Sequence, residues 1–137
     1  MSDGPADAWP RAITALTLFV DDLTAAKRFY TAVFGVPVLF EDEESTAFRF
    51  PNTVVNLLAA TAAPDLIEPE PVAPAAAGAR MQLTITVEDV DATARLVLER
   101  GAVLLNGPQD RPWGIRTAAF RDPSGHVWEI ADSGAGS

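Results

Sequence analysis

The sequence predicts an α+β domain in which two βαβββ modules form a curled mixed β-sheet cleft flanked by helices. Two observations carry this prediction. An apolar, β-branched run is followed by an aspartate and a helix with one apolar face, and this order occurs twice in the 137 residues. A shift of 67 positions also carries Leu18 onto Ile85 and Asp22 onto Asp89. An internal duplication explains both observations.

The first module begins with a predicted strand over residues 13–20, in which apolar and polar residues partly alternate. Asp22 is a suitable N-cap for a helix over residues 23–34, and Gly35 stands where that helix should end. Turn-forming residues then separate three short predicted strands, over residues 36–40, 46–50 and 53–59.

The second module repeats this order, starting with an apolar alternation over residues 83–87. Asp89 is placed to cap a helix over residues 90–100, and Gly101 should end it. Residues 122–125 (DPSG) are typical of a turn between the last two strands. The three strands that follow the helix are predicted over residues 103–105, 116–120 and 127–131.

We expect one domain, with module one over about residues 12–60, a linker over 61–79 and module two over about 80–132. The linker is rich in alanine and proline, a composition that continues neither a strand nor a helix. It is therefore predicted to be a mobile spacer.

Charge and composition argue against several classes of function. A formal net charge of -9 repels phosphate backbones and anionic lipid surfaces, so neither a nucleic-acid nor a membrane partner is expected. No apolar run reaches the roughly 20 residues that span a bilayer, and residues 1–10 lack the pattern of a secretory signal. We expect a cytoplasmic protein. The chain has no cysteine and one histidine, His126, so thiolate chemistry is excluded.

Three segments resemble the vicinal oxygen chelate superfamily, which contains glyoxalase, bleomycin-resistance proteins and extradiol dioxygenases. They are residues 16–35 (LTLFVDDLTAAKRFYTAVFG), 112–116 (PWGIR) and 120–129 (FRDPSGHVWE). The last two are similar to the closing hairpin of bleomycin-resistance-like members. The resemblance covers almost the whole chain and implies the duplicated fold already predicted from the repeat.

The resemblance also implies four positions at which metal-using members place ligands, one on the first and one on the last strand of each module. Here they are Ala15 and, by a less certain alignment, Asn56 in module one, with Gln82 and Glu129 in module two. Ala15 has no ligand atom, and a divalent ion normally requires three or more protein donors. We therefore expect no metal and no other cofactor. If a divalent metal binds, its ligands are Gln82 and Glu129, with Asn56 adding a weak carbonyl.

An iron dioxygenase is rejected, because that chemistry uses two histidines and a carboxylate. His126 follows Gly125 in the closing hairpin, where its position resembles a structural one. Glu129 has two interpretations, a solvated strand carboxylate or a cleft carboxylate that acts as a general base. Trp128 and Ile130 point to the opposite face of a regular strand, which favours the cleft for Glu129.

Aromatic residues supply the candidate ligand-binding surface. Phe48 and Phe50 share one face of a strand, and they either bind a ligand or lie in the core beneath the first helix. Trp113 lies in a loop bounded by proline and glycine, where a planar or cationic ligand can stack on it. Arg116 pairs with an anionic ligand group or with one of the many acidic residues, and the sequence does not choose between them. The predicted ligand-binding set is Trp113, Arg116, Phe48, Phe50, Asn56 and Gln82.

The leading functional hypothesis is a metal-free, bleomycin-resistance-like protein that sequesters an aromatic or cationic small molecule in a cleft. The alternative is a lyase or isomerase of the glyoxalase type, with Glu129 as the catalytic base and with or without a divalent metal. Because many members of the superfamily build each cleft from two chains, the resemblance also implies a homodimer.

Overall fold

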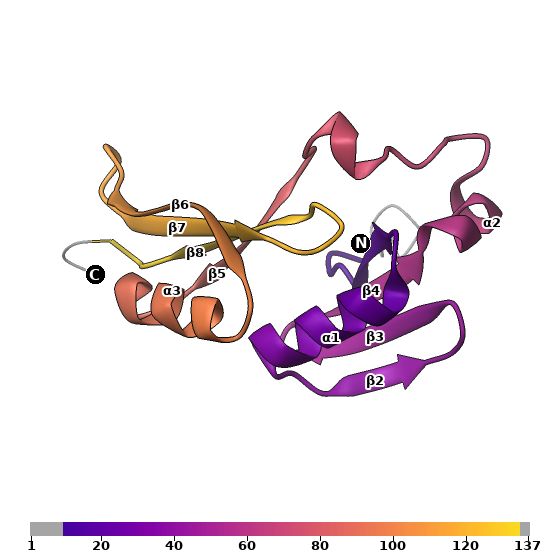
Figure 1. Cartoon of the computed structure of the whole chain (residues 1–137), viewed down its shortest axis with the longest axis horizontal. Coiled ribbons are helices and arrows are strands. Elements are labelled where there is room, and N and C mark those ends of the chain that lie inside the picture. The colour runs from indigo at the N-terminus through magenta and orange to yellow at the C-terminus, as the bar shows by residue number, and fades with distance from the viewer. Residues whose placement is uncertain (1–9, 135–137) are drawn as a thin grey trace, which may run out of the picture.

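The computed structural model describes residues 10–134. It contains two four-stranded sheets, three α-helices and two 3-10 turns (Figure 1). Their bounds are β1 (Ala15–Val20), α1 (Leu23–Phe34), β2 (Val38–Glu41), β3 (Ser45–Phe50), β4 (Thr53–Ala59), η1 (Ala60–Ala62), α2 (Pro64–Ile67), η2 (Ala75–Ala77), β5 (Gln82–Thr86), α3 (Val90–Glu99), β6 (Val103–Asp110), β7 (Arg116–Arg121) and β8 (Val127–Ala131).

The two sheets have the same topology, which confirms the predicted pair of βαβββ modules. The strand order is β1-β4-β3-β2 in the first sheet and β5-β8-β7-β6 in the second. In each sheet the first strand pairs in parallel with the last, and the remaining pairs are antiparallel. The parallel pairing follows from the helix that connects the first strand to the rest of its module.

The predicted helix starts are confirmed by their capping bonds. The Asp22 carboxylate accepts a hydrogen bond from the backbone N of Ala25, and the Asp89 carboxylate accepts one from Ala92, both at 3.0 Å. Gly35 ends α1 in the left-handed conformation, with φ of 63°, which glycine adopts without steric cost. Both helices therefore start at the residues that the sequence indicated, and α1 also ends there, whereas α3 ends at Glu99, one residue before its predicted end.

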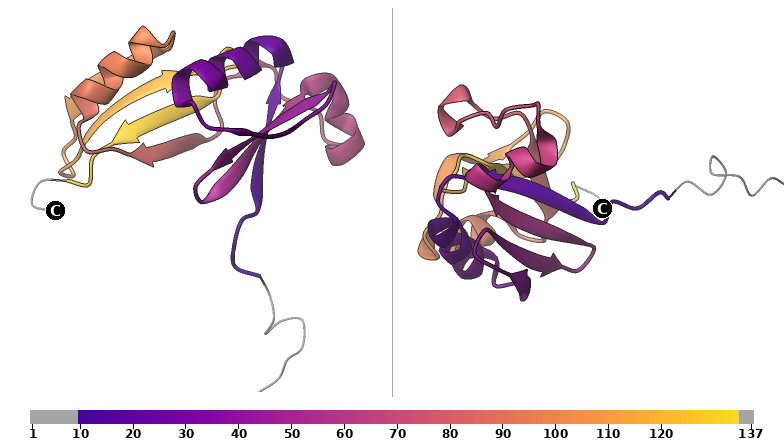
Figure 2. Two further views of the ribbon diagram at one scale, coloured as in Figure 1. Left: turned by 90° about the horizontal axis from the view of Figure 1, so that it is seen from below. Right: turned by 90° about the vertical axis from the view of Figure 1, so that its right-hand side faces the viewer.

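The helices α1 and α3 lie side by side on the same side of the two sheets (Figure 2, left). Each covers one face of its own sheet, and the buried side chains of both modules form a single cluster. An aromatic group from both modules lies at its centre, where Tyr30 stacks on Phe48 and contacts Trp128 edge-on. One core thus serves both modules, and their relative position depends on it.

A buried polar network joins α1 to the turn between β7 and β8. The Tyr30 hydroxyl donates to Asp122 Oδ2 (2.7 Å) and accepts from Trp128 Nε1 (3.0 Å). The other Asp122 oxygen accepts from the backbone N of Ser124 and of His126. Burial, followed by the charge of Asp122, raises the pKa of Tyr30 far above its ordinary value, so the phenol stays protonated and donates.

His126 also connects the two modules. Its Nε2 donates to the carbonyl oxygen of Phe19 at 2.8 Å, and its backbone N donates to the carboxylate of Asp122. Beside it, the backbone N of Asp21 donates to the Ser124 hydroxyl. These contacts give the histidine the structural position that the hairpin resemblance implied.

The sixth strand is longer than predicted. β6 continues to Asp110, whereas the sequence indicated a strand that stops at residue 105. Gly107 and Pro108 lie within β6, and proline is tolerated there because β6 is an edge strand, where a missing proline N–H leaves no ladder bond unmade. An irregularity in register near Gly107, with φ of 82°, lets the pairing with β7 resume.

The predicted linker contains regular turns, which corrects the expectation that it continues no helix. It holds η1, η2 and the four-residue helix α2, which begins at Pro64, a position where proline costs no hydrogen bond. From α2 the chain runs back across one side of the molecule to β5 (Figure 1). Among residues 10–134 there is no helix of the length and apolarity that a bilayer crossing requires.

Candidate functional site

Each sheet has one face against its helix and one face turned away. In the second sheet the core receives Leu83, Ile85, Phe120, Trp128 and Ile130, so by strand alternation their neighbours point to the other side. We call this other side the open face. Its residues on β5, β7 and β8 are Gln82, Thr84, Thr86, Thr117, Ala119, Arg121, Val127, Glu129 and Ala131.

The strand registers settle which residue of module one corresponds to Glu129. Glu129 lies between Thr84 and Ala119 on its neighbouring strands. Asn56 lies between Thr17 and Ala47 in the same way. Asn56 is therefore the structural counterpart of Glu129, as predicted.

The placement of Glu129 on the open face agrees with the predicted alternation. Trp128 and Ile130 are both 3% exposed in the core, while Glu129 is half-buried on the other side. Its Oε1 accepts a hydrogen bond from the Thr84 hydroxyl at 3.0 Å. Gln82 starts β5 two residues before Thr84 and is exposed, so the structure brings Gln82 and Glu129 onto the same face.

The four family ligand positions do not fit a divalent metal. Ala15 offers no donor, Asn56 and Gln82 offer neutral amides, and only Glu129 carries a charge. No group of three or more histidine, cysteine or acidic side chains suited to a metal occurs among residues 10–134. Pairing with a second chain leaves this set unchanged, because each module contributes the same two positions. Such a set binds divalent ions weakly.

Trp113 lies in the loop between β6 and β7, with 68% of its surface exposed. The guanidinium carbon of Arg111 is 5.8 Å from the centroid of its ring, a cation–π distance. Arg111 also donates to the Thr117 hydroxyl (2.9 Å) and to Asn106 Oδ1 (3.3 Å). Trp113 thus presents an aromatic surface beside an arginine that is fixed to the open face.

Arg116 pairs with acidic residues of its own module. Its Nε and Nη2 donate to the two carboxylate oxygens of Asp91 at 2.8 and 3.0 Å, and Nη1 donates to Asp110 at 3.0 Å. The Arg116 hydrogen bond is the main cause that lowers the pKa of Asp91 below its ordinary value. The sequence left open whether Arg116 pairs with an anionic ligand or with acidic residues. In the structure it pairs with acidic residues, so its hydrogen-bond donors are occupied.

Phe48 and Phe50 face the core, not the open face. Phe48 is fully buried beneath Tyr30, and Phe50 stacks on Trp128 and contacts Phe34 edge-on. The predicted ligand-binding role of Phe48 is therefore wrong, because no surface of this ring is accessible. The alternative that both rings are core residues agrees with these contacts.

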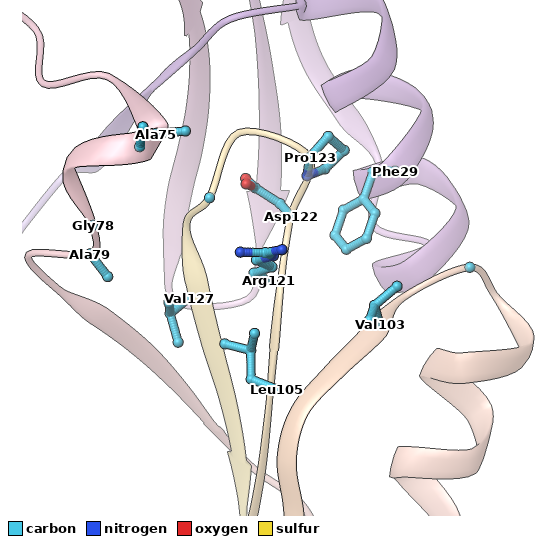
Figure 3. Close-up of a pocket in the computed structure, with 13 residues that line it drawn as sticks. Phe29, Ala75, Gly78, Ala79, Val103, Leu105, Arg121, Asp122, Pro123 and Val127 are labelled. Carbon is cyan, nitrogen blue, oxygen red and sulfur yellow. The ribbon is translucent and has the colours of Figure 1, made fainter.

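A cavity of about 640 Å³ lies between the linker and one end of the second sheet. Figure 3 shows Arg121 in the middle of its lining, with Phe29 of α1 on one side and the linker residues Ala75 and Ala79 on the other. Sequence reasoning missed Arg121. A signal was present, because Arg49 holds the same register position on β3, opposite Val54 as Arg121 is opposite Val127.

Comparisons with known proteins agree with this architecture. The family model described as Glyoxalase/Bleomycin resistance protein/Dioxygenase superfamily matches residues 12–130. The uncharacterized protein YraH of Bacillus subtilis is 31% identical over 119 residues, which are 84% of this chain and 93% of YraH. A glyoxalase/bleomycin resistance protein/dioxygenase from Nocardioides has a similar structure, with a TM-score of 0.83, 24% identity and coverage of 93% of this chain and 87% of its own.

Solved structures with quite different titles share the fold. A lactoylglutathione lyase from Agrobacterium tumefaciens has a TM-score of 0.71 at 22% identity, covering 90% of this chain and 95% of its own. TnmS3, an antibiotic binding protein from a Streptomyces strain, has a TM-score of 0.67 at 24% identity, covering 90% and 97%. At these identities the likeness extends to the fold alone.

Proposed function

Because the chain belongs to the glyoxalase/bleomycin resistance protein/dioxygenase superfamily, we propose that it binds a small aromatic or cationic molecule on the open face without a resident metal. The donor set carries the proposal. Of the four family ligand positions, only Glu129 holds a charged group, and its Oε1 already accepts from Thr84. A face that lacks metal ligands but keeps its polar groups is suited to binding rather than to Lewis-acid chemistry.

Trp113 and Glu129 supply two complementary contacts for such a ligand. The exposed Trp113 ring gives a stacking surface, and aromatic surfaces attract planar and cationic groups. The Glu129 carboxylate, with Gln82 beside it, offers acceptors for a cationic or hydrogen-bonding group. A ligand with a planar body and a positive group therefore fits this face best. The antibiotic-binding title of TnmS3 is compatible with the proposal, although that similarity extends only to the fold.

A thermal-shift screen of planar aromatic antibiotics, planar cations and divalent metals tests the proposal. A binder raises the midpoint in proportion to RT ln(1 + [L]/Kd). We expect planar cations to stabilise the protein and metals to leave it unchanged. Trp113→Ala and Glu129→Gln should each weaken a hit by about tenfold, whereas Trp113→Phe, which keeps an aromatic ring, should retain most of the affinity. The absence of any saturable hit, or hits that bind both variants as tightly as wild type, would overturn the proposal.

The alternative activity is an isomerase or lyase that uses Glu129 as a general base. The fold shared with the lactoylglutathione lyase and the position of Glu129 on the open face favour this second candidate. A direct test follows the hemithioacetal of methylglyoxal and glutathione by absorbance. Turnover that falls by about 10²- to 10⁴-fold in Glu129→Gln would support catalysis, and turnover unaffected by this change would exclude Glu129 as the base.

We further propose that two chains associate, so that a module of the partner covers the open face and completes a cleft. In one chain the exposed large apolar residues include Phe40 on the edge strand β2 and Val103 on the edge strand β6. Exposed apolar edges of this kind favour association. Sedimentation equilibrium at micromolar concentration should give the mass of two chains, and the mass of one chain would contradict the proposal.

A further inference from the structure

We propose that the cavity between the linker and the second sheet, at the Arg121 end of the open face, is a second binding site for a small anion with an apolar body, held by Arg121. The cavity has a volume of about 640 Å³. This lies within the range of about 300–1,000 Å³ in which small-molecule sites are found. Neither Glu129 nor Trp113 lines it, so the inference does not depend on the function proposed above.

Arg121 is available for a ligand because its side chain has no hydrogen-bond or ion-pair partner within residues 10–134. Three other arginines of the same module have hydrogen-bond partners. Arg116 donates hydrogen bonds to the carboxylates of Asp91 and Asp110. Arg111 donates to the Thr117 hydroxyl, and Arg100 donates to the carbonyl oxygen of Val33. Arg121 is exposed and stands in the middle of the cavity lining (Figure 3).

The surroundings of Arg121 are mainly apolar. They include the ring of Phe29 and the aliphatic side chains of Val103, Leu105 and Val127. Asp122 is the one acidic residue of the lining, and its two oxygens already accept from the Tyr30 hydroxyl and from two backbone amides. An arginine among apolar side chains holds a carboxylate or sulfonate with two parallel hydrogen bonds, and the apolar wall accepts the rest of the molecule.

The linker forms the opposite wall with small residues. Ala75 and Ala79 point toward the cavity (Figure 3), and Gly78 lies between them. The same stretch borders an adjoining cavity of about 310 Å³, which Arg80 lines. The small linker side chains leave the cavity open. Arg80 in the adjoining cavity adds a second positive charge within an otherwise acidic chain.

Two fluorescent probes that differ in charge test the site on the full chain. Anilinonaphthalene sulfonate carries an anionic group, and phenylnaphthylamine has the same rings without it. Wild type should bind the sulfonate saturably, with one site per chain. Arg121→Met should weaken it about tenfold or more, as loss of a charge-assisted pair does, while leaving the neutral probe unchanged. Arg49→Met is the matched control, because Arg49 has the same register position in module one but does not line the cavity.

A cavity-filling variant keeps the test decisive. Ala79 is exposed, so Ala79→Trp should leave the fold intact and block both probes. Glu129→Gln and Trp113→Ala should bind the sulfonate as wild type does, which separates this site from the contacts proposed at Glu129 and Trp113. The proposal would be overturned by equal sulfonate binding in wild type and Arg121→Met, by an equal loss in Arg49→Met, by undiminished binding in Ala79→Trp, or by binding that does not saturate.

Discussion

At the scale of single residues, Asp91 and Arg116 form the best-defined ion pair on the surface. Arg116 lowers the pKa of Asp91, mainly through its hydrogen bonds. We predict that Arg116→Gln raises the Asp91 pKa toward its ordinary value of about 3.9. A carbon-detected NMR titration of the aspartate carboxyl groups measures this shift. Asp42 is the internal control, because the main cause that lowers its pKa is a hydrogen bond from the backbone of Glu44, far from Arg116.

The sign of the pH effect follows from the direction of that shift. Because the pKa of Asp91 is lower in the folded chain, its contribution to stability is present above about pH 4 and is lost as the pH falls through the folded value. The pair is largely exposed, so the effect on the free energy of unfolding should be small. An Asp91 titration that is the same in wild type and Arg116→Gln would show that the pair does not persist in solution.

The sequence alone could not decide whether Arg116 pairs with a ligand or with acidic residues of the chain. The partners of Arg116 come from α3 and from the end of β6, and only the packing of α3 beside β7 brings them together. The face of Phe48 was equally open from its sequence, because alternation gives two faces without saying which one the helix covers. The face on which Glu129 lies was easier to predict, because its two large apolar neighbours, Trp128 and Ile130, indicated that the opposite face is the core.

At the scale of elements, Gly107 fixes the irregular part of β6. A Cβ at this position would lie 2.5 Å from the carbonyl oxygen of Thr117 and 2.8 Å from the Cα of Ala118, both backbone atoms that cannot move alone. We predict that Gly107→Ala destabilises the protein by more than the roughly 1–2 kcal/mol expected for the left-handed backbone alone. The midpoint of urea unfolding measures this loss.

Gly114 provides the matched comparison. Its φ of 99° is also positive, but a Cβ there would have no neighbour within 4 Å. Gly114→Ala should therefore show only the backbone cost of about 1–2 kcal/mol. If the two variants unfold at the same urea concentration, the close approach of β6 to β7 at Gly107 is not a constraint on the fold.

Local chemistry explains which elements the sequence could predict. The bounds of α1, β4 and β8 agree with the predicted ones, because a capping aspartate, a stop glycine or an apolar alternation marks each of them. The full length of β6 was not predicted, because glycine and proline are rare inside strands and only the tertiary structure places β6 at a sheet edge, where they are tolerated. The turns of the linker were missed for a related reason, since its composition indicated only a spacer.

At the scale of the whole molecule, the Tyr30 hydroxyl joins the two modules. Tyr30→Phe leaves Asp122 Oδ2 and Trp128 Nε1 without this partner inside the core. We predict a loss of about 1–3 kcal/mol in the free energy of unfolding. Because one core cluster includes both modules, unfolding should remain a single calorimetric transition in wild type and variant. Two resolved transitions in wild type, or unchanged stability in Tyr30→Phe, would contradict this coupling.

The relative position of the two modules could not be predicted from the sequence. The repeat indicated two similar modules, but the contacts of His126 with Phe19 and of Tyr30 with Asp122 join residues 107 and 92 positions apart. The cavity beside Arg121 depends on where the linker crosses, which no local pattern encodes. Two of the family ligand positions, by contrast, follow from the repeat, because Ala15 and Gln82 each lie seven residues before the capping aspartate of their module. The registers of both sheets give these two residues equivalent places.

The central claim of the proposed function is that the four family ligand positions do not form a metal site. Isothermal titration of Zn²⁺, Ni²⁺ and Mn²⁺ into the protein tests it most directly, with a variant that combines Ala15→His and Asn56→Glu as the positive control. Wild type should show no saturable binding at micromolar concentrations, and the variant, with four donors of the family type, should bind one metal per site. Stoichiometric binding by wild type that is lost in Glu129→Gln would contradict the account.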